Sequence, residues 1–250
     1  MEIYLSNMKN MSRDNQLAKL RNVIAIDGPA GAGKSTVARE VAHRMQYVYL
    51  DTGAMYRALT VRALQEPVDL TEEAALAQLA ARTDIELRPG TYEDSRVRVF
   101  VDQKEVTDQL RTPEVNEAVS YVAQSPAVRH HMKVQQRQLA SAGWVVAEGR
   151  DIASHVLPEA GCKIFLTASL EERARRRWEE LRAAGYQVHK ETVQENLRQR
   201  DRIDSERKVA PLVRVPDAYV IDSSCLTIEQ VVEMVVEYCK RGGLSAIRPG

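Results

Sequence analysis

The sequence predicts an α/β fold in three layers, with helices on both faces of a five-stranded parallel sheet. Short, nearly continuous apolar segments alternate with longer stretches of helical periodicity. Such apolar segments are typical of strands that are buried on both faces, and their alternation with helices is typical of a parallel sheet. The predicted strands cover residues 23–27, 47–51, 144–148, 163–167 and 218–222.

Two capping boxes mark helix starts in this pattern. Ser169 is followed three residues later by Glu172, and Thr227 by Gln230. In a capping box the two side chains accept hydrogen bonds from backbone N–H groups that the first helical turn leaves unpaired. Because helical periodicity follows both pairs, we expect a helix after each of the last two strands.

Residues 83–120 depart from this alternation. Polar and apolar residues alternate there, and turn-forming residues such as Pro89, Gly90 and Asp102 separate the segments. We therefore expect an inserted antiparallel patch. The predicted organisation is an N-terminal extension at 1–21, a main domain at 22–242 and a C-terminal tail at 243–250.

The amino-acid composition excludes several classes of function. The 250 residues carry 35 Lys and Arg and 35 Asp and Glu, so the sequence indicates no basic field for a nucleic-acid polymer or an anionic membrane. No apolar run approaches the roughly 18 residues of a membrane helix. The three cysteines, Cys162, Cys225 and Cys239, include no CxxC pair, which argues against a disulfide framework or a zinc site. We expect a cytoplasmic monomer.

The central motif is a phosphate-binding loop with the pattern Gly28-x-x-x-x-Gly33-Lys34-Ser35. Its glycines allow backbone N–H groups to surround phosphate oxygens, and Lys34 supplies positive charge to the terminal phosphates. Ser35 offers a hydroxyl to Mg²⁺. The loop follows a predicted strand and opens a helix, whose N-terminus attracts anions. The residues predicted to bind ATP are Gly28, Pro29, Ala30, Gly31, Ala32, Gly33, Lys34, Ser35 and Thr36.

Regulatory GTPases share such a loop but are disfavoured. The guanine-reading pattern NKxD is absent from the sequence, and none of the aspartates is followed by xxG. A phosphate loop alone does not define the phosphate acceptor, so other motifs must provide the acceptor site.

Charged residues follow two other predicted strands. Residues 51–57 read DTGAMYR, and Thr52 is placed to cap a helix that carries Tyr56 and Arg57. Residues 148–152 read EGRDI. Ligands of parallel α/β sheets bind beyond the carboxyl ends of the strands, where these residues would lie. A capped helix with a solvated arginine, and a surface salt bridge between Arg150 and Asp151, are the plainer alternatives.

A third charged segment covers residues 198–211. Its Arg200, Asp204 and Arg207 lie at i, i+4 and i+7 and share one face of a helix. Guanidinium groups bind phosphate in bidentate fashion, so this face suits a phosphate ester that also carries sugar hydroxyls. A solvated run of charges is the alternative.

The motifs together resemble the bacterial cytidylate kinases. IAIDGPAGAGKST, LDTGAMYRALT, EGRDI, KIFLTASLEERARRR and RDRIDSERKVAPL occur in the order and spacing of that family, over residues 22–240. The resemblance implies transfer of the ATP γ-phosphate to CMP or dCMP with Mg²⁺. It also implies that residues 83–120 form the insert that binds the nucleoside monophosphate, and that 173–190 form a short lid.

The resemblance also implies roles for individual residues. Arg57, Arg150 and Arg207 would hold the acceptor phosphate, and Thr52 and Tyr56 would also bind the substrate. Asp204 and Arg200 would hold the pentose hydroxyls. Ser120, Arg129 and Asp151 would face the cytosine, where a carboxylate accepts from the exocyclic amine and repels the carbonyl of uracil.

In the lid, Arg173 and Arg177 would offset the charge that develops on the transferred phosphoryl group, together with Lys34. Asp27 and Asp51 end strands near the phosphate loop. Structural capping is the preferred interpretation for both, and orientation of the waters around Mg²⁺ is the alternative.

One loop departs from the family pattern. Residues 153–160 read ASHVLPEA, where the family usually has Gly-Thr followed by apolar residues, so we expect no family contacts from Ala153, Ser154 or His155. Two alternatives stay open: a kinase of another small metabolite, and a binding or regulatory ATPase that needs no acceptor.

Overall fold

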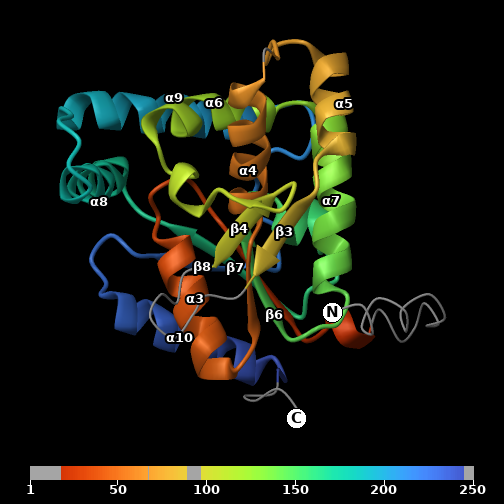
Figure 1. The fold of residues 1–250 in the computed structure, drawn as a ribbon. Coiled ribbons are helices and arrows are strands. Elements are labelled where there is room, and N and C mark those ends of the chain that lie inside the picture. The colour runs from red at the N-terminus through yellow and green to blue at the C-terminus, as the bar shows by residue number, and fades with distance from the viewer. Residues whose placement is uncertain (1–17, 67, 89–96, 245–250) are drawn as a thin grey trace.

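The computed structural model describes residues 18–66, 68–88 and 97–244 (Figure 1). Its large sheet contains five parallel strands in the order β2-β6-β1-β7-β8, so the predicted fold class is confirmed. The strands are β1 (Val23–Asp27), β2 (Val48–Asp51), β6 (Val145–Gly149), β7 (Cys162–Thr167) and β8 (Tyr219–Asp222). Their bounds agree with the predicted ones to within one residue.

Helices cover both faces of the sheet because its central strands are apolar on both sides. All five residues of β1 are buried. On one face, α3 (Lys34–Met45) and α10 (Ile228–Arg241) lie side by side and enclose a core that includes Ile24, Ile26 and Val235 (Figure 1). On the other face, residues such as Val23 and Ala25 pack against η2 (Ile152–Val156), a single turn of π-helix.

Four helices lie beside β2. They are α4 (Thr52–Gln65), α5 (Glu73–Arg82), α6 (Pro113–Val122) and α7 (Pro126–Ala140). The predicted antiparallel patch is present as β3 (Ile85–Arg88), β4 (Arg98–Val101) and β5 (Lys104–Glu105), which pack on α4. Pro89 and Gly90 lie outside the described residues. The patch is shorter than predicted, because a 3₁₀ turn, η1 (Thr107–Gln109), and helix α6 occupy the rest of 83–120.

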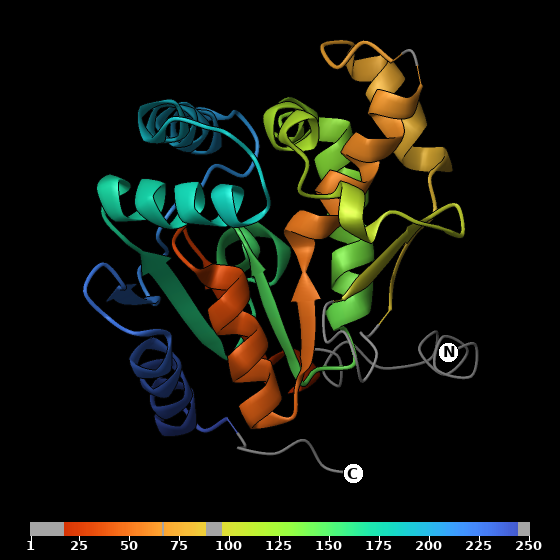
Figure 2. The ribbon, with the colours of Figure 1, turned by 60° about the vertical axis from the view of Figure 1, so that its left-hand side comes forward.

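Helices α8 (Leu170–Ala183) and α9 (Lys190–Glu206) pack against each other and stand above the large sheet (Figures 1 and 2). The hydroxyl of Ser169 accepts from the backbone N–H of Glu172, as predicted, but the Glu172 carboxylate pairs with Arg175 and Arg176 instead of completing the box. The second predicted box, Thr227 with Gln230, is complete at the start of α10.

The cysteines require a correction. Cys162 at the start of β7 and Cys239 near the end of α10 form a disulfide, whereas Cys225 is free and exposed. The prediction from the missing CxxC pair is therefore wrong for these two cysteines. They are 77 residues apart in the sequence, and only the packing of α10 against β7 brings them together. Among the described residues, no helix is long and apolar enough to cross a membrane.

All five strands of the large sheet point the same way. In Figure 2 their carboxyl ends face the region between the α8–α9 pair and the helices beside β2. The segments that follow β1, β2 and β6 therefore meet at one edge, although they are distant in the sequence.

Candidate active site

A cleft of about 1280 Å³ opens at this edge of the sheet. Its walls come from the phosphate loop, the start of α4, the segment after β6, helices α6 to α9 and the β8–α10 loop. Of the residues predicted to bind the acceptor, all ten line the cleft: Thr52, Tyr56, Arg57, Ser120, Arg129, Arg150, Asp151, Arg200, Asp204 and Arg207. The tertiary structure thus brings together residues that the sequence distributes over more than 150 positions.

The phosphate loop forms one end of the cleft. A side chain at Gly28 would lie 1.9 Å from the backbone oxygen of Leu166 in β7, so only glycine allows the loop to pass so closely. Gly33 has a φ of 92° and precedes the first turn of α3. Lys34 is buried, and its Nζ donates to the backbone oxygen of Pro29 over 2.7 Å. Burial, followed by the nearby Arg150, lowers the pKa of Lys34 to about 7.

Glu148 is a residue that the sequence analysis did not single out. It is the last residue but one of β6 and is buried. Its Oε1 accepts from Ser35 Oγ over 2.5 Å and from Tyr49 Oη over 3.1 Å. Burial, and then the Glu148 charge, raise the pKa of Tyr49 well above its usual value, so the phenol is a proton donor. The signal was available, since Glu148 belongs to the same strand-end motif as Arg150 and Asp151.

The Ser35–Glu148 pair is the part of the cleft that fits a divalent cation. Hydroxyl and carboxylate oxygens are the ligands that Mg²⁺ accepts from phosphate-loop proteins, with the nucleotide phosphates and water completing the shell. Within the described residues no group of three or more His, Cys, Asp or Glu side chains could hold a metal on its own.

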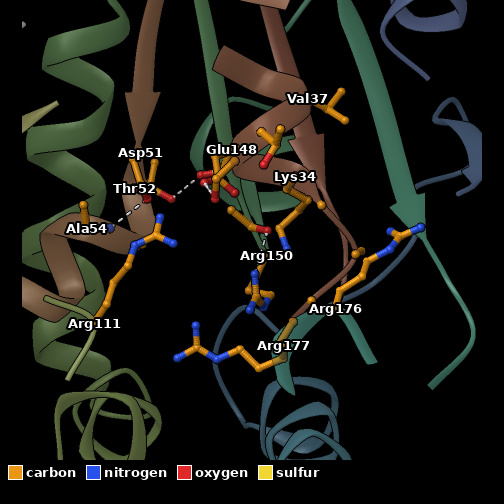
Figure 3. Close-up of a pocket in the computed structure, with 18 of the residues that line it drawn as sticks. Lys34, Val37, Asp51, Thr52, Ala54, Arg111, Glu148, Arg150, Arg176 and Arg177 are labelled. Atoms are coloured by element: carbon orange, nitrogen blue, oxygen red, sulfur yellow. Dashed lines mark hydrogen bonds between the residues drawn. The ribbon is translucent and has the colours of Figure 1, made fainter. Parts of the chain in front are cut away.

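The cap of α4 differs from the prediction. Asp51, not Thr52, is the N-cap residue, and its Oδ1 accepts from the backbone N–H of Ala54 over 2.8 Å (Figure 3). Thr52 begins the helix and its Oγ1 donates to the backbone oxygen of Glu148 over 2.6 Å. The Asp51 carboxylate, at the end of β2, accepts from a free N–H group in the first turn of α4. The Thr52 hydroxyl is therefore not needed as a cap and connects α4 to β6 instead. The preferred interpretation of Asp51 as a cap is confirmed.

Positive charge is concentrated in the middle of the cleft. Lys34 and Arg150 approach each other there (Figure 3), with Arg57 and Arg200 nearby. Burial, followed by Arg57 and Arg150, lowers the pKa of Arg200 to about 9. Nε of Arg57 and Nε of Arg200 are buried without a hydrogen-bond partner. Unpaired donors and mutual repulsion of this kind are relieved by a bound anion.

Arg150 and Asp204 form a partly buried ion pair beside these cations. Nε of Arg150 donates to Oδ2 of Asp204 over 2.8 Å. Burial acts to raise the pKa of Asp204, but Arg150, Arg200 and then Arg207 outweigh it, so the pKa of this carboxyl is lowered. Asp204 lies in the last turn of α9 and Arg207 is the residue that ends it, so the predicted helix face is present except for its last member.

Asp151 is the centre of a second buried cluster. Its two carboxylate oxygens accept from Nη2 of Arg129, over 2.5 Å, and from Nη2 of Arg207, over 3.3 Å. The Arg129 guanidinium also lies 5.5 Å from the centre of the Tyr56 ring. Ser120, on α6, lines the same part of the cleft. This cluster offers a flat aromatic surface, a carboxylate and two guanidinium groups to a planar polar ligand.

The arginines of α8 point to different parts of the structure. Arg177 extends into the cleft, as does Arg111 from the opposite side (Figure 3), and both pair with Glu180. Arg176 is bound to Ser223 in the β8–α10 loop. Arg173 lies behind the phosphate loop, where it donates to the backbone oxygen of Ala30 over 3.1 Å and to Asp201.

This cleft defines a class of protein. A loop for nucleotide phosphates, a hydroxyl–carboxylate pair suited to a cation and a second anion site within the same cleft are the components of a phosphate-loop kinase. Charge is provided on both sides of the point where a phosphoryl group would pass.

Comparison with known proteins identifies the family. Residues 24–241 match the family described as cytidylate kinase, and the chain belongs to that family. Curated proteins named cytidylate kinase are 53% identical over 88% of this chain and 96% of theirs in Geobacillus kaustophilus, and 54% over 87% and 96% in Geobacillus thermodenitrificans. The Bacillus subtilis protein of that name is 52% identical over 86% of this chain and 94% of its own.

The family settles the open alternatives in favour of a nucleoside monophosphate kinase with ATP as phosphate donor. A solved structure from Thermus thermophilus aligns with a TM-score of 0.40 and 22% identity, over 86% of this chain and 94% of that one. That likeness is too weak to add to the assignment.

Proposed function

We propose that the two ends of the cleft divide the reaction of a cytidylate kinase between them. ATP with Mg²⁺ occupies the phosphate-loop end, CMP or dCMP occupies the end around Asp151, and the γ-phosphoryl group passes between them near Arg150. The reaction is a direct transfer of the phosphoryl group from ATP to the acceptor phosphate, which gives ADP and CDP or dCDP.

The observation that carries this proposal is the cluster of cations between the two ends, of which Lys34 is buried and Arg57 and Arg200 are half-buried. Lys34, Arg57 and Arg200 all have a pKa lowered chiefly by burial. In both arginines Nε is buried without a hydrogen-bond partner. Such an arrangement is costly unless anions bind there. Phosphoryl transfer depends mainly on positioning and on charge stabilisation in a dry site, which pre-oriented cations supply.

On the donor side, residues 28–36 hold the ATP phosphates and Lys34 contacts the terminal ones. Ser35 and Glu148 are the residues that would hold Mg²⁺, whose charge would offset that of the phosphate oxygens. Tyr49 keeps the Glu148 carboxylate in place through its hydroxyl. Arg173 acts on the backbone of the loop near Ala30, and Arg177 reaches the transferred group from the lid.

On the acceptor side, Arg57, Arg150 and Arg207 bind the CMP phosphate, with Thr52 and Tyr56 beside it. Asp204 and Arg200 bind the pentose hydroxyls. Ser120, Arg129 and Asp151 face the base, where the Asp151 carboxylate accepts from the cytosine amine. Nη2 of Arg129 and Nη2 of Arg207 each donate to one oxygen of Asp151, so these two arginines fix the orientation of its carboxylate toward the base.

A coupled assay of ADP release tests this assignment. CMP, dCMP, UMP, AMP, shikimate and a blank without acceptor are compared for the wild type and for Asp151→Ala. We expect rapid turnover with CMP and dCMP, and a reduced preference for CMP over UMP in the variant. An unchanged CMP/UMP ratio would show that Asp151 does not read the base. Turnover with CMP no faster than the blank would contradict a kinase function altogether.

We also propose that the protein acts as a monomer in the cytoplasm. The complete set of acceptor and donor residues comes from one chain, so a single copy contains both halves of the site. Sedimentation of the purified protein at assay concentration tests the first point, and fractionation of the source cells tests the second.

A further inference from the structure

Asp27 ends β1 and connects the two halves of the site, although it does not line the cleft. Its side chain is buried, with 1% exposed. Oδ1 accepts from the backbone N–H of Ile152 over 2.8 Å, and Oδ2 accepts from that of Ala153 over 2.8 Å. One carboxylate therefore binds two successive N–H groups 125 and 126 residues away in the sequence.

The residues that adjoin this contact in the sequence belong to the two ends of the cleft. Gly28, the next residue after Asp27, begins the phosphate loop. Ile152 directly follows Arg150 and Asp151, which face the acceptor end of the cleft. The carboxylate thus fixes the acceptor segment to the strand from which the donor loop emerges.

The acceptor segment also has an unusual local structure. It continues into the π-helical turn η2, in which the N–H groups of His155 and Val156 both donate to the backbone oxygen of Asp151, over 2.9 and 3.0 Å. The N–H groups of Ile152 and Ala153 are at the start of this turn, where no helical carbonyl is available. Asp27 supplies the missing acceptors from a neighbouring strand.

We propose that Asp27 is a positioning residue for the acceptor nucleotide. By holding Ile152 and Ala153, it sets the distance of Arg150 and Asp151 from the phosphate loop. This inference rests on the acceptor roles proposed above for those two residues. This positioning requires the carboxylate of Asp27, because its two oxygens accept from two N–H donors. The amide of an asparagine would turn an NH₂ group toward one of these donors and lose that hydrogen bond.

A purely structural cap would behave differently. It would lower thermal stability and leave the apparent affinities for both substrates unchanged. A positioning residue moves groups that contact CMP but leaves the ATP-binding loop in place, so its loss separates the two Michaelis constants.

The experiment compares Asp27→Asn with the wild type in KM for CMP, KM for ATP, kcat and melting temperature. We expect the KM for CMP to rise about 10-fold, the equivalent of one lost hydrogen bond in a binding segment, and the KM for ATP to change less than about 2-fold. Asp69→Asn is the matched control, because Asp69 also accepts from a backbone N–H, that of Thr71, but on an exposed turn. It should leave both constants unchanged.

Asp27→Glu keeps the charge but displaces the oxygens, and provides a second variant if the asparagine protein does not fold. Its CMP affinity, measured by calorimetry without turnover, should also fall while its ATP affinity is kept. Equal changes for both substrates, or a lower melting temperature with unchanged KM for CMP, would overturn the inference.

Arg150→Lys and Asp151→Ala, measured in parallel, separate this inference from the proposed function. If they leave the KM for CMP unchanged, the acceptor assignment is wrong and the inference falls with it. If they raise it and the Asp27 variants do not, only the inference is wrong.

Discussion

Ser35 Oγ and Glu148 Oε1 lie 2.5 Å apart, although 113 residues separate them in the sequence. The hydroxyl comes from the first turn of α3 and the carboxylate from the end of the adjacent strand β6. This contact joins the phosphate loop to β6, and the residues after β6, Arg150 and Asp151, face the acceptor end of the cleft. Substitution of Glu148 therefore tests the donor end of the site.

Glu148→Gln should lower kcat/KM for ATP by about 10-fold to 100-fold, the range typical of groups that orient metal ligands. The amide keeps the size of the side chain but loses the charge that would attract a cation. Activity should therefore require a higher Mg²⁺ concentration in a titration at fixed ATP. Tyr49→Phe, which removes only one hydrogen bond to Glu148, should give a smaller shift in the same direction. An unchanged Mg²⁺ requirement in Glu148→Gln would contradict the placement of the cation.

Lys34→Ala should abolish turnover and leave CMP binding measurable. The donor phosphates lose their charge partner, whereas the groups around Asp151 are unaffected. CMP binding is measured by calorimetry without ATP, so the readout does not depend on catalysis. An equal loss of CMP binding would argue against separate donor and acceptor sites.

The Cys162–Cys239 disulfide should stabilise the fold. It closes a loop of 77 residues, for which the entropic effect on the unfolded chain is on the order of 4 kcal/mol. Denaturant unfolding with and without a thiol reductant measures the difference. Cys239→Ser should remove the effect of the reductant, and Cys225→Ser should keep it, because Cys225 is free. If the reductant has no effect on the wild type, the disulfide is absent under those conditions.

The free energy of unfolding should depend on pH through the raised pKa of the buried Asp27 carboxyl. Burial, opposed by the two backbone hydrogen bonds, raises its pKa from 3.8 to about 6; Asp151 adds to the rise and Lys34 opposes it. Because the folded state binds the proton more tightly than the unfolded chain, this contribution to stability is complete below pH 3.8 and is lost as the pH rises through about 6.

The loss amounts to about 3 kcal/mol for such a shift. Asp27→Asn cannot titrate, so the difference in unfolding free energy between wild type and variant should fall by about 2 kcal/mol from pH 4 to pH 7, while the other titrating groups cancel. Urea unfolding at a series of pH values provides the measurement. A difference that is constant with pH would show that Asp27 has an ordinary pKa.

The strands of the large sheet and the position of the phosphate loop could be predicted from the order of amino acids alone. These depend on local patterns: continuous apolar runs for buried strands, and glycines with Lys34 and Ser35 between a strand and a helix. The charged motifs after β2 and β6 and in α9 were also visible, because parallel strands place their carboxyl ends at one edge of a sheet. The family resemblance then gave the acceptor.

Which side chains meet at that edge depends on the three-dimensional packing and could not be predicted. The strand order puts β6 beside β1, and this places Glu148 on Ser35 and the N–H groups of Ile152 and Ala153 on Asp27. It also brings Cys162 to Cys239. Local periodicity contains no information on strand order or on the rotamers of long side chains, because both depend on packing between segments that are distant in the chain.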